Sequence, residues 1–83
     1  MSTQTTDARG QQVIELVSSH MDIPKEKISL DSQFAADLGF DSLDMIEFVM
    51  LVEDQFDISV PDKESETIVS VRDAVRAIEK LIS

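Results

Sequence analysis

The stretch Leu38-Gly39-Phe40-Asp41-Ser42-Leu43-Asp44 decides how this chain is organised. A loop containing a glycine ends in it, and an apolar, acidic helix begins at about Asp41. Asp41 is a favoured N-cap residue, and Asp44 three positions later resembles a capping box with Asp in place of Glu. Ser42 therefore stands at a helix start, where free backbone N–H groups and the helix dipole favour an attached anion. Because no neighbouring group would activate its hydroxyl as a nucleophile, we interpret Ser42 as an attachment point.

The predicted helix continues to Gln55 or Phe56 and has more apolar residues than one buried stripe needs. We expect part of them to form the core and three others, at i, i+3 and i+7, to form an apolar centre with an acidic rim, as in an interface. The core candidates are Phe48, Val49, Val52 and Phe56, and the interface candidates are Leu43, Ile46 and Met50. The alternative that the latter three are also core stays open at this point.

An acidic band follows the same segment. Its members are Asp37, Asp41, Asp44, Glu47, Glu53 and Asp54, and no Lys or Arg occurs from Ile28 through Asp62. A merely solvated helix would be expected to carry basic residues at i+4 spacing to offset like-charge repulsion. We therefore favour a role in recognition over a plain solvated face.

The rest of the chain predicts an all-α domain. Thr6 or Asp7 caps a first helix that runs to about His20, and a long connection over residues 22–40 contains Pro24, which interrupts the helix. A short helical turn is expected near Lys63–Ile68, and Ser70 caps a last helix. The apolar positions expected to pack are Val13, Leu16, Val17 and Met21 in the first helix, Leu30, Phe34, Leu38 and Phe40 in the connection, and Val71, Ala74, Val75, Ile78, Leu81 and Ile82 in the last helix.

Composition narrows the function classes. The 83 residues predict one domain over 7–83 after a frayed segment 1–6, and the net charge of −10, from 17 acidic against 7 basic residues, opposes binding to nucleic acid and to anionic membranes. It favours basic protein partners. The absence of cysteine excludes disulfides and thiol chemistry by the protein itself. We expect no signal peptide, no membrane insertion, a monomer and a cytoplasmic location.

Two other site chemistries fit poorly. A G-x-S-x-G nucleophile elbow is absent around Ser42, and His20, the only histidine, is expected to be a surface or helix-end residue. An EF-hand loop counted from Asp37 would need Gly and Glu where Ser42 and Phe48 stand. We therefore expect neither a catalytic residue nor a structural metal site, although weak divalent-cation binding to the acidic band is plausible.

The segment Asp37-Leu38-Gly39-Phe40-Asp41-Ser42-Leu43-Asp44-Met45-Ile46-Glu47 resembles the attachment motif of stand-alone, type II acyl carrier proteins of bacterial fatty-acid synthesis. The resemblance continues through Phe48-Val49-Met50, Glu53-Asp54-Gln55-Phe56-Asp57 and Val60-Pro61-Asp62 and spans nearly the whole chain after residue 6. It implies a small four-helix bundle with three longer helices, a short third helix and a long loop between the first two helices. Phe40, Met45, Leu51, Ile58 and Gly10 depart from the pattern familiar in primary fatty-acid carriers.

By that resemblance, a phosphopantetheinyl transferase attaches 4′-phosphopantetheine from coenzyme A to Ser42, and the arm carries acyl groups as thioesters. The thiol of the arm would supply the sulfur that the chain lacks. The acidic helix would bind basic patches on ketoacyl synthases, reductases, dehydratases and acyltransferases. Asp41, Leu43, Asp44, Ile46, Glu47 and Met50 would carry that role, with Asp37, Glu53 and Asp54 extending the surface. The alternatives are a specialised acyl or peptidyl carrier of a polyketide, nonribosomal-peptide or unusual-lipid pathway, and an unmodified interaction adaptor.

Overall fold

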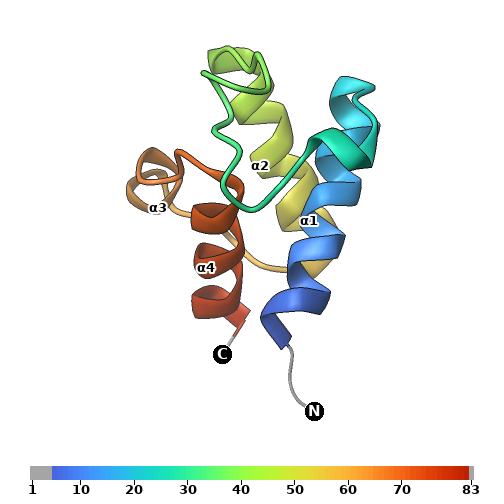
Figure 1. The fold of residues 1–83 in the computed structure, drawn as a ribbon. Helices are drawn as coiled ribbons and strands as arrows, with labels where there is room; N and C mark the ends of the chain where they lie inside the picture. Colours follow the sequence, from blue (N-terminus) through green and yellow to red (C-terminus); the bar gives the residue numbers. More distant parts are fainter. Residues whose placement is uncertain (1–4, 83) are drawn as a thin grey trace.

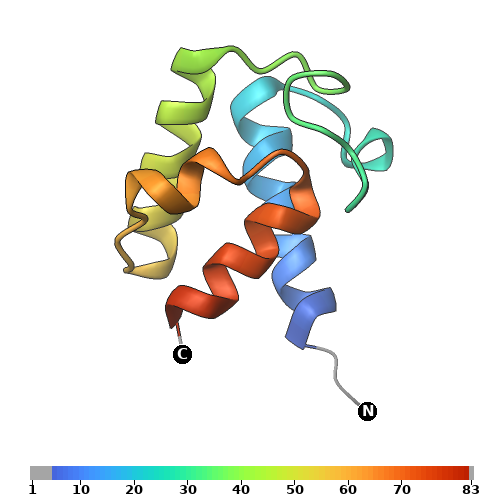
Figure 2. The same cartoon turned by 90° about the vertical axis from the view of Figure 1, so that its left-hand side faces the viewer.

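A computed structural model describes residues 5–82 as a bundle of helices (Figures 1 and 2). The elements in chain order are α1 (Thr5–Met21), the 3₁₀ turn η1 (Lys25–Lys27), α2 (Ser42–Phe56), the short α3 (Asp62–Glu66) and α4 (Val71–Ile82). The described residues contain no β-strand, only an isolated antiparallel bridge between Gln33 and Ser70. The predicted all-α fold with a short third helix is confirmed. None of the described helices is both long enough and apolar enough to cross a membrane.

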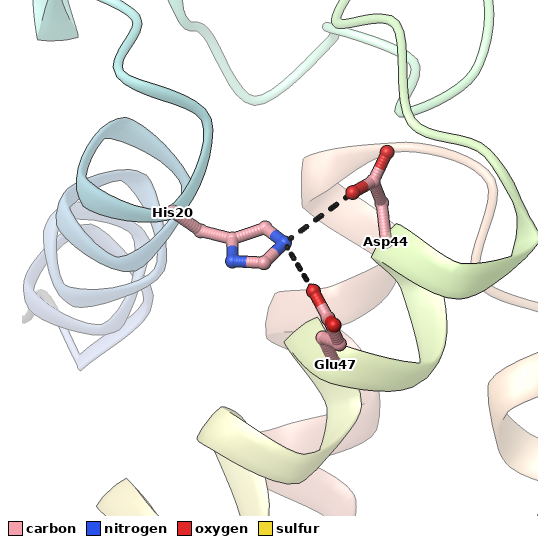
Figure 3. A group of neighbouring side chains, drawn as sticks. All are labelled: His20, Asp44 and Glu47. Carbon is pink, nitrogen blue, oxygen red and sulfur yellow. Dashed lines mark ion pairs between the residues drawn. The ribbon is translucent and has the colours of Figure 1, made fainter.

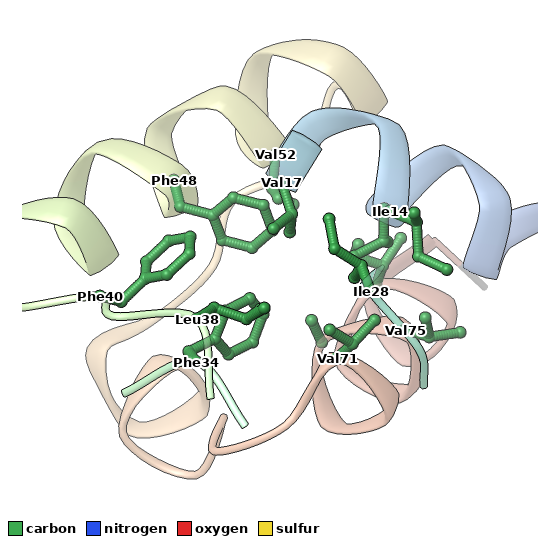
Figure 4. Close-up of a cluster of buried hydrophobic side chains, with 13 residues drawn as sticks. Ile14, Val17, Ile28, Phe34, Leu38, Phe40, Phe48, Val52, Val71 and Val75 are labelled. Carbon is green, nitrogen blue, oxygen red and sulfur yellow. The ribbon is translucent and has the colours of Figure 1, made fainter. Parts of the chain in front are cut away.

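The core lies where α1, α2 and α4 meet. α1 packs against both α2 and α4, and α2 also contacts α4. Three phenylalanines fill the end of the core near the start of α2: Phe34 packs against Phe40 and Phe48 with ring centroids 5.0 and 5.2 Å apart (Figure 4). The other buried apolar side chains of this cluster are Val13, Ile14, Val17, Ile28, Leu38, Val52, Val71, Ala74, Val75 and Ile78.

The long connection between α1 and α2 is held in place by α4 and the residues just before it. The Phe34 N–H donates to the Val69 carbonyl at 2.9 Å, and the Val71 and Arg72 N–H groups donate to the carbonyls of Ser32 and Leu30. Phe34 is also almost completely buried. Backbone hydrogen bonds and apolar burial together fix a segment that has little regular secondary structure. This segment leads directly into the start of α2 and holds it in place.

The glycine at position 10 is explained by close packing against the connection between α1 and α2. A Cβ built on Gly10 would lie 3.1 Å from Leu30 Cδ2, so the missing side chain lets the connection lie close against α1. This departure from the familiar pattern is therefore explained by the contact between α1 and Leu30.

Three sequence-based expectations need correction. α1 begins at Thr5, inside the segment 1–6 that was expected to precede the domain; residues 1–4 lie outside the described part. Val49 and Phe56 are half-buried rather than core, and Phe56 lies beneath the Arg9 guanidinium, 5.4 Å from ring centroid to Cζ. Ile82, the last residue of α4 and of its apolar stripe, is 43% exposed.

Candidate functional site

Ser42 is the first residue of α2, and its position is set by a complete capping box. The Asp44 N–H donates to Asp41 Oδ1 at 2.9 Å, and the Asp41 N–H donates to Asp44 Oδ2 at 3.1 Å. This pairing satisfies two backbone donors that a helix start otherwise leaves without partners. The predicted cap is confirmed. It holds the first turn of α2 in place and so fixes the position of Ser42, whose side chain is exposed.

The Asp41 carboxylate is the anion at this helix start. Its hydrogen bond from the Asp44 backbone N–H is the main cause that holds the pKa of Asp41 below its ordinary value of 3.8. The sequence-based expectation that the N–H groups at this helix start are free to bind an attached anion is therefore wrong for the Asp44 N–H. The Ser42 side chain is exposed and forms no hydrogen bond with any residue in the described part of the chain, so its hydroxyl is accessible to an external reagent.

The residues just before Ser42 explain how an exposed serine is held on a rigid support. Gly39 has a φ of +76°, which residues with a side chain rarely adopt. Phe40 then turns inward: its ring is 5% exposed and lies 5.8 Å from the Phe48 ring (Figure 4). The Phe40 N–H also donates to the Phe34 carbonyl at 2.9 Å. The bulky residue at position 40 thus anchors the site from the core.

The three interface candidates on α2 are exposed. Leu43 and Met50 are each 61% exposed, and Ile46 is 57% exposed. The alternative that these side chains belong to the core is therefore excluded. Leu51, on the same helix, is also 40% exposed. Apolar side chains exposed together on one helix are costly to leave in water, which favours a partner that covers them.

Several members of the acidic band have partners inside the molecule. Asp37 Oδ2 accepts the Gln33 N–H at 2.8 Å, and Glu53 Oε2 accepts the Val60 N–H at 2.8 Å. Asp41 and Asp44 form the cap described above. These four residues therefore help to hold the loops and the start of α2. Asp54 is exposed, as is Glu47, which forms a long ion pair with His20.

A groove beside Ser42 runs between α2 and α3. Most of its lining is apolar, and Ser42 is among the residues that line it. The apolar residues that line it are Met45, Ile46, Val49, Met50, Val60 and Ile68. Val49, predicted to be core, lines this groove instead. Met45, one of the departures from the familiar pattern, packs partly on the core and partly here.

His20 is the residue whose surroundings sequence reasoning missed. It lies in the last turn of α1, as expected, but its side chain is only 15% exposed and faces Asp44 and Glu47 of α2 (Figure 3). Its ring also lies 5.8 Å from the Phe40 ring. A contact between two helices far apart in the sequence leaves no local spacing signal, so the pattern could not reveal it.

Two comparisons identify the family. The family described as "Phosphopantetheine attachment site" matches residues 11–78. The chain is similar to proteins named "Acyl carrier protein" from Wolinella succinogenes (45% identical, covering 78% of this chain and 86% of the relative), Akkermansia muciniphila (42%, covering 86% and 89%) and Campylobacter concisus (41%, covering 83% and 90%).

An exposed hydroxyl at a capped helix start is compatible with attachment of the phosphopantetheine group that the family description names. The family relationship settles the class of function: the protein carries a covalently bound 4′-phosphopantetheine group, whose thiol bears acyl groups, and it is not itself a catalyst. The chain therefore belongs to the acyl carrier protein family.

Proposed function

We propose that Ser42 is the residue to which 4′-phosphopantetheine is joined, and that the loaded protein shuttles acyl intermediates between enzymes of fatty-acid biosynthesis. The observation that carries the proposal is the exposed Ser42 hydroxyl at the first position of a capped helix, within the motif quoted above. As an acyl carrier protein, the chain interacts with a phosphopantetheinyl transferase and with acyl-processing enzymes. Because the Ser42 hydroxyl has no hydrogen bond to a side chain that could act as a base in the described structure, the transferase would have to remove its proton.

The α2 surface around Ser42 supports a docking role. The exposed Leu43, Ile46 and Met50 offer apolar contact, and carboxylates lie around them. Basic patches on ketoacyl synthases, reductases, dehydratases or acyltransferases would complement these charges. Glu47 and Asp54 are the strongest candidates for direct pairing because neither accepts a backbone hydrogen bond in the described structure. Asp37, Asp41, Asp44 and Glu53 would contribute charge while they maintain the local fold.

The groove between α2 and α3 favours an acyl cargo. Its apolar lining next to Ser42 suits a hydrocarbon chain better than a charged aminoacyl group, since burying a charge without a partner is costly. This supports fatty-acid synthesis over a peptidyl carrier. A specialised polyketide or unusual-lipid carrier would use the same groove, and remains the second candidate because Met45, which departs from the pattern of primary fatty-acid carriers, lines it.

The attachment test uses coenzyme A, a broad-specificity phosphopantetheinyl transferase and intact mass spectrometry. The parent chain should gain the mass of one arm, and Ser42→Ala should gain none while it keeps the helical circular dichroism of the parent. Ser59→Ala, an exposed serine in the loop after α2, is the matched control and should be modified like the parent. Modification of Ser42→Ala would overturn the assignment.

The cargo test is intact mass spectrometry of the protein purified from its native cell. Fatty-acid synthesis predicts a ladder of thioesters that differ by two-carbon units. A single branched, hydroxylated or aminoacyl species would instead support a specialised carrier. The monomeric state and the cytoplasmic location stay predictions, to be tested by light scattering and by fractionation.

A further inference from the structure

The His20 imidazole brings a nitrogen donor to two carboxylates across the gap between α1 and α2. His20 Nε2 lies 3.7 Å from Asp44 Oδ1 and 3.7 Å from Glu47 Oε1 (Figure 3). One donor atom from each of the three residues lies within 4.8 Å of the other two. The group therefore combines three side chains of types that bind metals, drawn from two helices.

The nitrogen is also without a hydrogen-bond partner. His20 Nε2 is shielded from solvent, and 3.7 Å is too long for a hydrogen bond to either carboxylate. A buried polar atom without a partner is uncommon and calls for an explanation. No Lys or Arg occurs between Ile28 and Asp62, so no cation from α2 or from the loop that precedes it neutralises the two carboxylates here.

Asp44 is oriented so that one of its carboxylate oxygens is free to bind a metal ion. Its Oδ2 accepts the Asp41 N–H in the capping box, and its other oxygen, Oδ1, faces His20. The cap thereby holds one carboxylate oxygen in a fixed direction. Glu47 is 51% exposed and can rotate its carboxylate toward the same point.

We propose that His20, Asp44 and Glu47 form a binding site for a borderline transition-metal ion such as Zn²⁺. The ligand atoms of a tetrahedral Zn²⁺ site, each about 2.0–2.2 Å from the metal, lie roughly 3.3–3.6 Å apart, so a small closure of the observed group would suffice. The imidazole nitrogen favours such ions over Ca²⁺ and Mg²⁺, which prefer oxygen ligands. Three protein ligands leave further positions for water. The proposal departs from the sequence-based expectation of no metal site, and it does not depend on Ser42.

A bound ion would join the last turn of α1 to the first two turns of α2. It would also neutralise two acidic residues next to the attachment helix start. Because the ion binds an arrangement that only the folded chain provides, it should raise thermal stability by mass action.

The experiment titrates metal-free protein with ZnCl₂ in excess Mg²⁺, which occupies carboxylates that bind cations without selectivity. Calorimetry of the parent should give one Zn²⁺ per chain. His20→Gln should weaken binding by about tenfold or more, since even substitutions of residues that only hold a metal ligand in place cost about 10- to 100-fold. Glu47→Gln should weaken binding less, and Glu66→Gln on α3, which makes the same change of charge outside the group, should bind like the parent. Asp44 is left unchanged because it caps α2.

A second readout is the NMR spectrum of the His20 ring, together with thermal melts. His20 is the only histidine, so its ring resonances in an NMR spectrum are unambiguous. Stoichiometric Zn²⁺ should shift the Nε2 signal and should raise the melting midpoint of the parent but not of His20→Gln. Failure of the parent to bind, equal binding by His20→Gln, or ring signals that do not move while Zn²⁺ binds would each overturn the proposal.

Discussion

α2 and α4 are both amphipathic helices of the same bundle, but they distribute their apolar residues differently. α4 buries Val71, Ala74, Val75, Ala77 and Ile78 on one face. α2 buries Phe48 and Val52 and leaves Leu43, Ile46, Met50 and Leu51 exposed. A helix that serves stability alone has no reason to keep the second set in water. The difference indicates that α4 supports the fold, whereas α2 both supports it and presents a surface.

The two helices also differ in how their charged residues are paired. Arg72 of α4 pairs with Asp31 at 2.9 Å, and Lys80 pairs with Glu64 at 2.8 Å. α2 has no basic residue, and within the described structure its carboxylates face backbone N–H groups, His20 or solvent. Opposite charges are thus matched within the molecule at α4, while α2 keeps an excess of negative charge for an outside partner.

The buried face of α2 should behave like α4, and this gives the largest expected effect. Phe48 is 1% exposed and contacts both Phe34 and Phe40. Phe48→Ala should lower the free energy of unfolding by about 3–5 kcal/mol, because it removes a large side chain from a packed core. Urea denaturation measures the loss. A change below about 1 kcal/mol would mean that α2 is not anchored as described.

The helix starts offer a test in which the two helices should agree. The pKa of Asp73 is lowered chiefly by the hydrogen bond from the Ser70 backbone N–H, and the pKa of Asp41 by that from Asp44. A carboxylate whose folded-state pKa is depressed stabilises the fold above its ordinary pKa of 3.8, and this stabilisation is lost as the pH falls through the lower folded-state value.

Asp41→Asn and Asp73→Asn should therefore each lower the melting midpoint at pH 7, and the deficit should shrink as the pH falls below 3.8. Thermal melts across a pH series measure this. A deficit that stays constant at low pH would show that the ionised carboxylate is not the source of the stabilisation.

A charge reversal should separate α2 from α4 with a smaller effect, seen in kinetics rather than in stability. Glu47→Lys should slow association with a phosphopantetheinyl transferase, and the defect should shrink as salt rises, because rim charges act through steering that salt screens. Glu79→Lys on α4 is the comparison and should leave association nearly unchanged. Equal slowing by both variants would show that association depends on the net charge of the molecule and not on the position of the acidic band.

Much of this arrangement could be predicted from the sequence. The capping box of α2 and the all-α fold follow from local spacing, which reports on one helix at a time. Spacing favoured an interface role for Leu43, Ile46 and Met50, and the structure settled it by showing that all three are exposed. The half-burial of Val49 and Phe56 could not be predicted, since it depends on how α3 and Arg9 approach α2. The same limit applies to His20: its two acidic neighbours lie more than twenty positions away and meet it only through helix packing.

The central claim is that α2 presents to partners the kind of side chain that α4 buries, and the isoleucines Ile46 and Ile78 test it directly. Ile46 is 57% exposed and Ile78 is 1% exposed. The measurement pairs urea denaturation with stopped-flow binding to a phosphopantetheinyl transferase for Ile46→Ala and Ile78→Ala.

Ile78→Ala should lose about 2–5 kcal/mol of folding stability, whereas Ile46→Ala should lose much less and should speed dissociation from the transferase with little dependence on salt. If Ile46→Ala instead loses as much stability as Ile78→Ala and its folded fraction binds the transferase like the parent, Ile46 is core and the claim is contradicted.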